Sequence, residues 1–281
     1  MKEKKISNEE LRKLHQIGLE MLIEFDRICR KYGIKYSIES GTLLGAVRDG
    51  GFIPWDDDVD VSMTRKEYNK FLSVYQRELD STRFFFDCHE TDSDYIFGYG
   101  KLRRLGTEFK QVGHETMKQR EEIFMDVFVV DNVPDNFIMR RIHGFICNCI
   151  KNILNSEMML ENDNYWIRFK SVLLNLIPKE KVFSFLKFFE KINNNKKTEL
   201  CRMYTYTPAS GWGIPRKCYD SYCWLEFEGH EFMAFEDYDT YLRYAYGDNY
   251  MDLPEESKRV PHIGVYDLSF GDVFVGGNRI E

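Results

Sequence analysis

The sequence predicts an α/β protein, and three observations lead to this fold class. As far as residue 135, segments rich in β-branched and aromatic residues alternate with amphipathic helical segments, as in layered α/β proteins. Over 136–200 leucine, isoleucine, phenylalanine, lysine and asparagine dominate, which predicts helices alone. Over 201–281 tyrosine, glycine and aspartate become frequent. We therefore expect a core over 1–135, a helical insertion over 136–200, and a C-terminal segment over 201–281.

The first predicted helix runs from Ser7 to Tyr32. Ser7 and Glu10 have the spacing of a capping box, in which each side chain bonds the other residue's backbone N–H. Apolar residues then recur every three or four positions, and Gly33 follows as a stop signal. We expect the apolar stripe of this helix to cover one face of a sheet.

The remaining elements follow from the same periodicities. Strands are expected at Lys35–Glu39, Val59–Met63, Phe84–Cys88, Tyr95–Leu102 and Phe124–Val130. Helices are expected at Gly41–Arg48, at Arg65–Leu79, as two or three segments between Phe137 and Lys197, and at Tyr238–Tyr246. A hairpin is expected at Trp224–Phe232.

Charge is distributed unevenly along the chain. The whole protein carries a formal net charge of −7, but the stretch 137–197 contains 11 Lys or Arg against 5 Asp or Glu. An acidic protein is a poor general binder of nucleic acid, which requires concentrated positive charge. The basic stretch indicates either an anionic partner, such as a membrane surface or a lipid-linked glycan, or an ordinary helical unit with a solvated basic face.

The acidic run Trp55-Asp56-Asp57-Asp58-Val59-Asp60-Val61 is the main candidate for chemistry. Alternate residues of a strand share a face, so an extended run would point Asp56, Asp58 and Asp60 together. Asp57 would fall on the other face, and we expect it before the strand or at an exposed edge, outside the chemistry.

Clustered carboxylates repel one another unless a cation lies between them, and hard oxygen ligands suit Mg²⁺ or Mn²⁺. A solvated acidic turn or a Ca²⁺ loop is the alternative interpretation. The upstream segment favours phosphate chemistry, because Gly41 allows close backbone approach and a helix beginning near Thr42 would direct free N–H groups at a phosphate. Arg48 could add a guanidinium fork.

The segment from Tyr36 to Met63 resembles the LicD family of bacterial phosphocholine transferases, which are related to fukutin-type ribitol-phosphate transferases. The residues that carry the resemblance are Gly-Thr-Leu-Leu-Gly-Ala-Val-Arg, beginning at Gly41, and Gly-Phe-Ile-Pro-Trp-Asp-Asp-Asp-Val-Asp, ending at Asp60. Further segments that look like family motifs are Lys101-Leu102-Arg103, Met125-Asp126-Val127-Phe128, Phe227-Glu228-Gly229, Tyr246-Gly247-Asp248 and Leu253 through His262.

The resemblance implies a nucleotidyltransferase core like that of DNA polymerase β, with a mixed sheet flanked by helices. It implies that Asp58, Asp60 and Asp126 bind Mg²⁺ or Mn²⁺, and that Asp56 or Asp126 could accept a proton. It also implies a nucleotide site at Gly41 and Thr42, with phosphate contacts from Arg48, Lys101 and the neighbouring Arg103. The implied donor is CDP-choline or another CDP-alcohol, the acceptor is a glycan or lipid-linked oligosaccharide, and CMP is released.

Several other residues have both a functional and a structural interpretation. Trp55 could stack on cytosine or help to surround a quaternary ammonium, although core packing is the more frequent role of a single aromatic residue. His262 could contact the substrate or be a surface-loop histidine. The seven cysteines have spacings that favour free thiols over a zinc site.

Two further functions fit parts of the sequence. A nucleotide-sugar glycosyltransferase also uses an Asp-x-Asp motif to bind a metal, but it leaves the glycine-containing segment at Gly41 unexplained. A binding protein with a degenerate metal site is the non-enzymatic alternative. The N-terminus resembles no secretory signal, and no stretch approaches the length of a membrane span, so we expect a cytoplasmic protein with a peripheral position at the inner membrane face as a further option.

Overall fold

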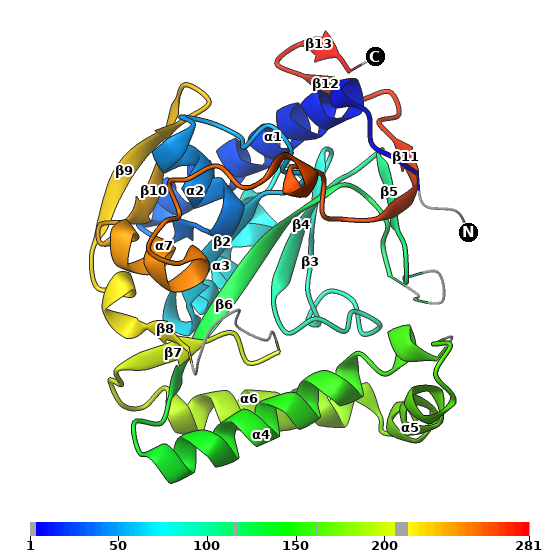
Figure 1. Ribbon diagram of the computed structural model, residues 1–281, viewed down its shortest axis with the longest axis vertical. Coiled ribbons are helices and arrows are strands. Elements are labelled where there is room, and N and C mark those ends of the chain that lie inside the picture. Colours follow the sequence, from blue (N-terminus) through cyan, green and yellow to red (C-terminus); the bar gives the residue numbers. More distant parts are fainter. Residues whose placement is uncertain (1–3, 115–116, 118, 161, 206–212, 281) are drawn as a thin grey trace.

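The computed structural model describes residues 4–114, 117, 119–160, 162–205 and 213–280, and the following account refers to these residues. A central sheet runs in the order β1 (Ser37–Ile38), β2 (Asp60–Thr64), β6 (Phe124–Val133), β4 (Gly100–Arg104) and β3 (Phe84–Asp87). The far end of β6 also pairs with β7 (Leu200–Arg202), which pairs in turn with β8 (Ile214–Pro215). Figure 1 shows a separate layer of helices beyond this end of the sheet.

The sheet is mixed, as predicted, because β2 and β6 are parallel whereas the other pairs are antiparallel. The register places Asp60 opposite Asp126 on β6, and Asp126 opposite Lys101 on β4. Since neighbouring residues of a strand point to opposite faces, Val61 and Val127 lie on the other side, where they are fully buried. The sheet thus has one apolar face and one face that carries charge.

Helices α1 (Asn8–Tyr32) and α3 (Arg65–Glu78) pack against the sheet and against each other. α1 begins with the predicted capping box, because the Ser7 side chain bonds the Glu10 N–H and Glu10 bonds back to Ser7. It ends at Gly33, whose φ of 60° is the left-handed conformation that glycine adopts without strain. Both predicted ends of the first helix are therefore confirmed.

A hairpin and two helices surround the edge of the sheet at β1. The hairpin consists of β9 (Tyr222–Phe227) and β10 (His230–Phe235), and both it and α7 (Tyr238–Tyr246) were predicted. Helix α2 (Ser40–Arg48) contacts β2, β9 and α7. Ser37 accepts a hydrogen bond at its Oγ from the Phe235 N–H at 3.0 Å, which fixes β10 beside β1. Residues some 200 positions apart are thereby brought together.

The basic stretch forms α4 (Phe137–Leu154), the short 3₁₀ helix η1 (Glu157–Met159), α5 (Tyr165–Asn175) and α6 (Lys179–Asn193). This confirms the prediction of two or three helices. The helices share a small hydrophobic cluster of their own, formed by Cys147, Ile150, Leu154, Val182, Phe183, Leu186, Phe189 and Tyr204. Arg65 joins this layer to the sheet through ion pairs with Asp131 at 2.7 Å and Glu190 at 2.8 Å. In the described part of the chain, no helix is both long and apolar enough to cross a membrane.

Some strands differ from the prediction. β4 begins only at Gly100, so Tyr95–Tyr99 are not in a strand, and β1 is two residues long. The pairing of β5 (Glu108–Gln111) with β11 (Val265–Ser269), and the hairpin of β12 (Phe274–Val275) with β13 (Asn278–Arg279), were not predicted. These strands are short, and their pairing depends on distant segments rather than on a strong local pattern.

The assignment of the core can be tested with the same substitution at a buried and at an exposed position. Val127→Ala removes two methyl groups from a fully buried position, so we expect it to lower the free energy of unfolding by about 2 kcal/mol in urea titrations. Val112→Ala, at a position 44% exposed, should change this free energy by less than about 0.5 kcal/mol. Equal effects at the two positions would contradict the assignment of the core.

Candidate active site

A cavity of about 370 Å³ lies where α2, the start of β2, β7–β8 and α7 meet. Its carboxylates are those of Glu39, which precedes α2, of Asp56 and Asp58, which precede β2, and of Asp60, which begins β2. Its aromatic wall comes from Phe128, Tyr241, Tyr244 and Tyr246. Arg202 and His262 are the basic side chains of the wall. The cavity therefore combines concentrated negative charge with flat apolar surface, which suits a charged ligand that carries a ring.

Asp56, Asp58 and Asp60 all line this cavity, as the alternation of the acidic run predicted. The backbone that arranges them is different, because β2 begins only at Asp60 and the preceding residues are irregular. Burial, followed by the neighbouring Asp58 carboxylate, raises the pKa of Asp56 to about 8. The two carboxylates thus compete for the charged state.

Of the two positions expected for Asp57, the one before the strand is confirmed and the exposed edge is not. It precedes the strand, but its side chain is fully buried. Its Oδ2 accepts a hydrogen bond from the Ile263 N–H at 3.0 Å, and its Oδ1 lies 2.8 Å from Nδ1 of His262. Because Ile263 belongs to the C-terminal segment, Asp57 attaches that segment to the acidic run.

Asp60 and Asp126 lie side by side on the parallel strands β2 and β6. Lys101 on β4 donates from Nζ to Oδ1 of Asp126 at 2.6 Å. Burial and the nearby Asp58 carboxylate hold the pKa of Asp60 well above its usual range. Among the described residues, the buried Oδ1 of Asp60 has no hydrogen-bond partner. A buried carboxylate oxygen without a donor, surrounded by other carboxylates, is the environment that a divalent cation stabilises.

His262 lies over the acidic run with its side chain 58% exposed. Its Nε2 is 3.1 Å from Oδ2 of Asp58, and the hydrogen bonds that it donates to Asp57 first and to Asp58 second raise the pKa of His262 to about 11. Within the described chain, Asp56, Asp57, Asp58 and His262 are the group whose possible metal-ligand atoms all lie within 4.8 Å of one another. The structure therefore brings His262 to the carboxylates, whereas Asp60 and Asp126 lie deeper on the sheet.

The N-terminus of α2 faces the cavity through Ser40 and Gly41. The left-handed residue here is Ser40, with φ 50°, and not Gly41. Gly41 is required for space instead, because a Cβ at this position would lie 2.2 Å from Oδ2 of Asp56. Thr42 is buried, and its hydroxyl accepts a hydrogen bond from the Asp60 N–H at 3.0 Å. The segment thus fixes the start of β2 while it turns the first N–H groups of a helix toward the cavity.

Three predicted site residues lie elsewhere. Arg48 is at the opposite end of α2, roughly 12 Å along the helix axis, and pairs with Asp49 at 2.9 Å. Trp55 lies beside it, with the Arg48 guanidinium 5.9 Å from the ring centroid. Arg103 is buried on β4 and donates to Asp87 at 2.6 Å. These three side chains contact the surrounding fold, and none of them lines this cavity.

The sequence analysis did not identify Glu39, Arg202 or the tyrosines of α7 as site residues. Glu39 is fully buried, and its Oε1 accepts a hydrogen bond from the Tyr241 hydroxyl at 2.8 Å. Burial raises the pKa of Glu39 to about 7, and the hydrogen bonds from Ser62 and Tyr241 oppose this shift. Two local signals were available: an acidic residue two positions before Gly41, and Tyr241 and Tyr244 at helical spacing.

A second cavity of about 700 Å³ lies further along the same face of the sheet. It is lined by Thr64 at the end of β2 and by Val130 on β6. Thr64 is four residues beyond Asp60 and Val130 is two residues beyond Phe128, so each lies on the same side of its strand as a residue that lines the first cavity. Its other walls come chiefly from α3, the segment 97–99 and α6. Its lysines and arginines are Arg65, Lys66, Lys187, Lys191 and Arg216, the last of which begins the short helix η2 (Arg216–Tyr219). The cavity therefore lies between the sheet and the helical layer.

Comparisons with known proteins found a family that matches part of the chain and several relatives. Residues 33–142 match the family described as LicD/FKTN/FKRP, nucleotidyltransferase domain. The chain is 30% identical over 274 residues to the lipopolysaccharide cholinephosphotransferase LicD of Haemophilus influenzae, and the match covers 90% of this chain and 95% of that protein. An uncharacterized protein of Rickettsia prowazekii is 26% identical over 148 residues, which are 49% of this chain and 44% of that protein. Another, from Rickettsia typhi, is 42% identical over 55 residues, covering 20% and 18% respectively.

The raised pKa of Glu39 predicts how stability depends on pH. Between about pH 4.5 and pH 7 the folded protein keeps a proton on Glu39 that the unfolded chain has lost, so this group's contribution to stability falls as the pH rises through that window. Relative to the wild type, Glu39→Gln should therefore gain up to about 3 kcal/mol in urea unfolding on going from pH 5 to pH 8, measured with EDTA.

Glu231→Gln on the exposed start of β10 is the matched control and should leave the pH dependence unchanged. A Glu39→Gln protein whose stability follows the wild-type pH curve would show that the Glu39 carboxyl titrates normally.

Proposed function

Because the chain belongs to the LicD family, we propose that it transfers phosphocholine, or a similar alcohol or polyol phosphate, from a CDP-linked donor to a hydroxyl group of a cell-surface glycan precursor, releasing CMP. The Haemophilus influenzae relative is a lipopolysaccharide cholinephosphotransferase that matches over nearly the full length of both chains, which supports a transferase. The observation that carries the proposal is the carboxylate-lined cavity at the N-terminus of α2, because a helix N-terminus and a cation between carboxylates are complementary to a pyrophosphate.

Asp58, Asp60 and Asp126 are the residues that would hold Mg²⁺ or Mn²⁺. The buried, unpartnered oxygen of Asp60 and the mutual repulsion of these carboxylates fit a divalent cation. When bound, such an ion neutralises the developing charge of the phosphates. Lys101 would act through Asp126, because its ammonium group holds one oxygen of that carboxylate in place.

The pyrophosphate of the donor would lie at the N-terminus of α2, near Ser40 and Gly41. Arg202, buried on β7 and facing the same cavity, would supply the positive charge that the sequence analysis assigned to Arg48. The tyrosines of α7 offer faces for the cytosine ring or the choline ammonium group. We assign this sheet as a nucleotidyltransferase core of residues 1–135, with the segment 201–281 completing its site.

In the proposed reaction the acceptor hydroxyl oxygen attacks the β-phosphorus of the donor. The bond between that phosphorus and the bridging oxygen breaks, so CMP leaves with the bridging oxygen. The hydroxyl proton passes to a carboxylate, for which we assign Asp56, because Asp56 lines the cavity whereas Asp126 is held by Lys101. The protein contributes chiefly by positioning the two substrates and balancing their charge.

We propose the second cavity as the acceptor site. It lies on the same face of the sheet, it is large enough for several sugar units, and amide and ammonium groups line it. Lys66, on the first turn of α3, is one of its exposed cations. An anionic glycan precursor that enters along this face would present a hydroxyl toward Asp56.

A metal-dependent nucleotide-sugar glycosyltransferase remains the second candidate, because Asp58 and Asp60 also form an Asp-x-Asp motif. The released nucleotide distinguishes the two activities: CMP from a CDP-alcohol, or a nucleoside diphosphate from a sugar nucleotide. Either reaction would take place in the cytoplasm or at the inner membrane face, where both nucleotide donors occur.

The proposed metal ligands can be tested by conservative substitution. Asp58→Asn and Asp60→Asn should each lower CMP release from CDP-choline with Mg²⁺ roughly a thousandfold, because the loss of one ligand charge costs several kcal/mol of transition-state stabilisation. EDTA should have the same effect on the wild type. Asp252→Asn, at an exposed position, is the matched control. Activity retained in both site variants, with unchanged unfolding curves, would contradict the assignment.

The acceptor site can be tested separately from the donor site. Lys66→Ala should raise KM for a delipidated lipopolysaccharide acceptor about threefold to tenfold, whereas slow CMP release without an acceptor should stay unchanged. Lys70→Ala is the control, because Lys70 lies one turn further along α3 and pairs with Glu67 at 2.8 Å. If the two variants behave alike, the acceptor does not bind in the second cavity.

A further inference from the structure

The helical layer exposes far more apolar surface than the rest of the protein. Of the 25 large hydrophobic residues that are exposed in the described chain, 17 lie between Phe137 and Ile192. Single exposed apolar residues are common on soluble proteins, but a concentration of this kind marks an interaction surface. The remaining eight are scattered over the much larger part of the chain that forms the sheet, the hairpins and α7.

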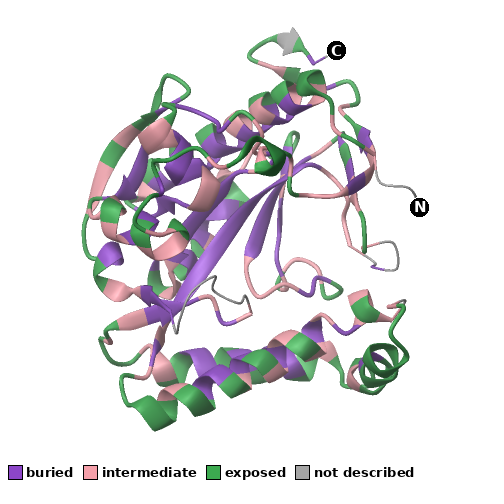
Figure 2. Cartoon of the chain, in the orientation of Figure 1, coloured by how far each residue is buried: buried purple, intermediate pink, exposed green. Residues whose placement is uncertain are grey.

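Helix α5 shows the excess most directly. Ser171 is its only buried residue in the described structure, and Figure 2 shows the helix as exposed along nearly all of its length. Yet Trp166 is 74% exposed and Phe169 48%, and Leu176, directly after the helix, is 75% exposed. A helix that is apolar on most of its surface is stable when something covers it. Within the described chain, the main contacts of α5 are with α4 and η1.

Helices α4 and α6 each have two apolar faces. Their inner faces already form the shared hydrophobic cluster, through residues such as Cys147 and Phe183. α4 has a second stripe at helical spacing, made of Ile138, Ile142 and Phe145, and α6 has another, made of Phe185, Phe188 and Ile192. These second stripes do not contribute to the internal cluster, so folding of the chain alone does not account for them.

Basic residues lie among these apolar residues. Arg168 and Lys170 are exposed within α5, between Trp166 and Ser171. The whole stretch 137–197 carries 11 Lys or Arg against 5 Asp or Glu, although the protein as a whole has a net charge of −7. Aromatic residues interleaved with Lys and Arg are typical of helices that lie at the boundary between lipid headgroups and acyl chains.

We propose that the exposed apolar and basic surface of α4, α5 and α6 docks onto an anionic phospholipid bilayer. Two features favour lipid over a second copy of this chain. The stretch 137–197, which forms this surface, has a net positive charge and exposes Arg168 and Lys170 on α5, so pairing the surface with itself would bring like charges together. The acidic remainder of the protein would be repelled by an anionic membrane, which leaves the helical layer as the side that approaches it.

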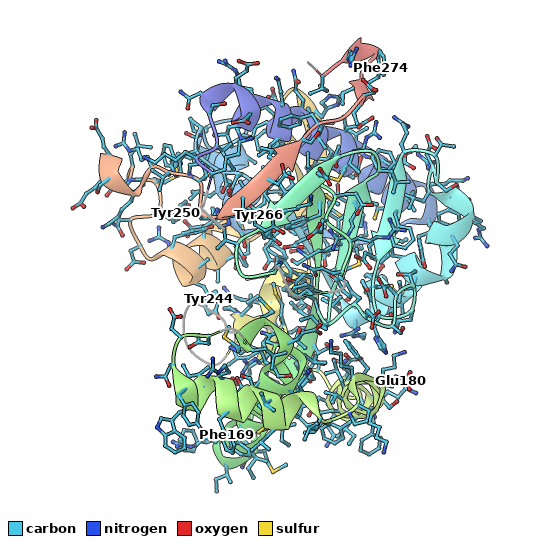
Figure 3. All side chains as sticks on the ribbon, turned by 90° about the vertical axis from the view of Figure 1, so that its right-hand side faces the viewer. Phe169, Glu180, Tyr244, Tyr250, Tyr266 and Phe274 are labelled. Carbon is cyan, nitrogen blue, oxygen red and sulfur yellow. The ribbon has the colours of Figure 1, made fainter. Side chains whose placement is uncertain are left out.

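Docking would give the protein a defined orientation. Figure 3 shows Phe169 at the end of the helical layer and Phe274 at the opposite end of the molecule. One side of α6 carries Lys187 and Lys191, which line the second cavity, and another side carries Phe185 and Phe188, which are exposed. The membrane surface would therefore lie close to the second cavity. The idea that this closeness helps a lipid-linked acceptor to reach the second cavity rests on the proposed function. The docking itself does not depend on that function.

Vesicle flotation of the full chain tests the docking without donor or acceptor. The protein should float with vesicles that contain about 30% phosphatidylglycerol in phosphatidylcholine, and much less with phosphatidylcholine alone. Raising the salt concentration from about 0.1 M to about 0.5 M should weaken binding, because screening reduces the electrostatic part. Failure to float with the anionic vesicles would overturn the proposal, whatever the catalytic activity.

Paired variants identify the surface. Trp166→Ser with Phe169→Ser, and Arg168→Glu with Lys170→Glu, should each lower the partition coefficient at least about tenfold. The controls make the same changes elsewhere: Phe274→Ser with Leu253→Ser, and Lys35→Glu with Lys258→Glu, all at exposed positions. Test and control pairs with equal effects would overturn the assignment of this surface.

Two further measurements separate lipid from a protein partner. Brominated lipids should quench the fluorescence of Trp166, and the quenching should be lost in Trp166→Phe, because only an inserted indole ring reaches the acyl chains. Sedimentation without lipid should show a monomer. A dimer that dissociates in the Trp166→Ser, Phe169→Ser protein, without quenching in the wild type, would assign this surface to self-association instead. Each variant should retain the wild-type unfolding curve, because these side chains are exposed.

Discussion

The parallel pairing of β2 with β6 is the constraint on which the rest of the site depends. Its register sets Asp60 beside Asp126, and the antiparallel pairing of β4 with β6 then sets Lys101 beside Asp126. The apolar residues between these positions must point the other way, where α1 and α3 cover them. A slip of one residue would bury the carboxylates in the core and expose the valines. The register that stabilises the core is therefore also the register that places the charges.

Negative charge at this position is stabilised by groups from distant parts of the chain. The Ile263 N–H and His262 hold Asp57, the Tyr241 hydroxyl holds Glu39, and Lys101 holds Asp126. Thr42 contributes by accepting the N–H of Asp60, and the absence of a side chain on Gly41 leaves room for the Asp56 carboxylate. The C-terminal segment is therefore part of the site, because without it two buried carboxylates would lose hydrogen-bond donors.

The helical layer differs from the rest of the protein in its core, its outer surface and its charge. Its internal cluster is small, its outer faces are apolar, and its charge is opposite to that of the protein as a whole. Arg65 links it to the sheet through Asp131 and Glu190, and the second cavity lies between the layer and the sheet. The chemistry proposed for the acidic cavity and the lipid contact proposed for the helices thus occupy different parts of one chain, with the second cavity between them.

The sequence by itself determined the elements whose signals are local. The capping box of α1, the bounds of α7, the helical nature of 137–197 and the gathering of Asp56, Asp58 and Asp60 all depend on residues within a few turns or strand positions of one another. Only the tertiary structure decided the burial of Asp57 and the arrival of Arg202 and Tyr241 at the cavity. These depend on backbone paths between residues as many as 200 positions apart, and helical or strand periodicity contains no information about such paths.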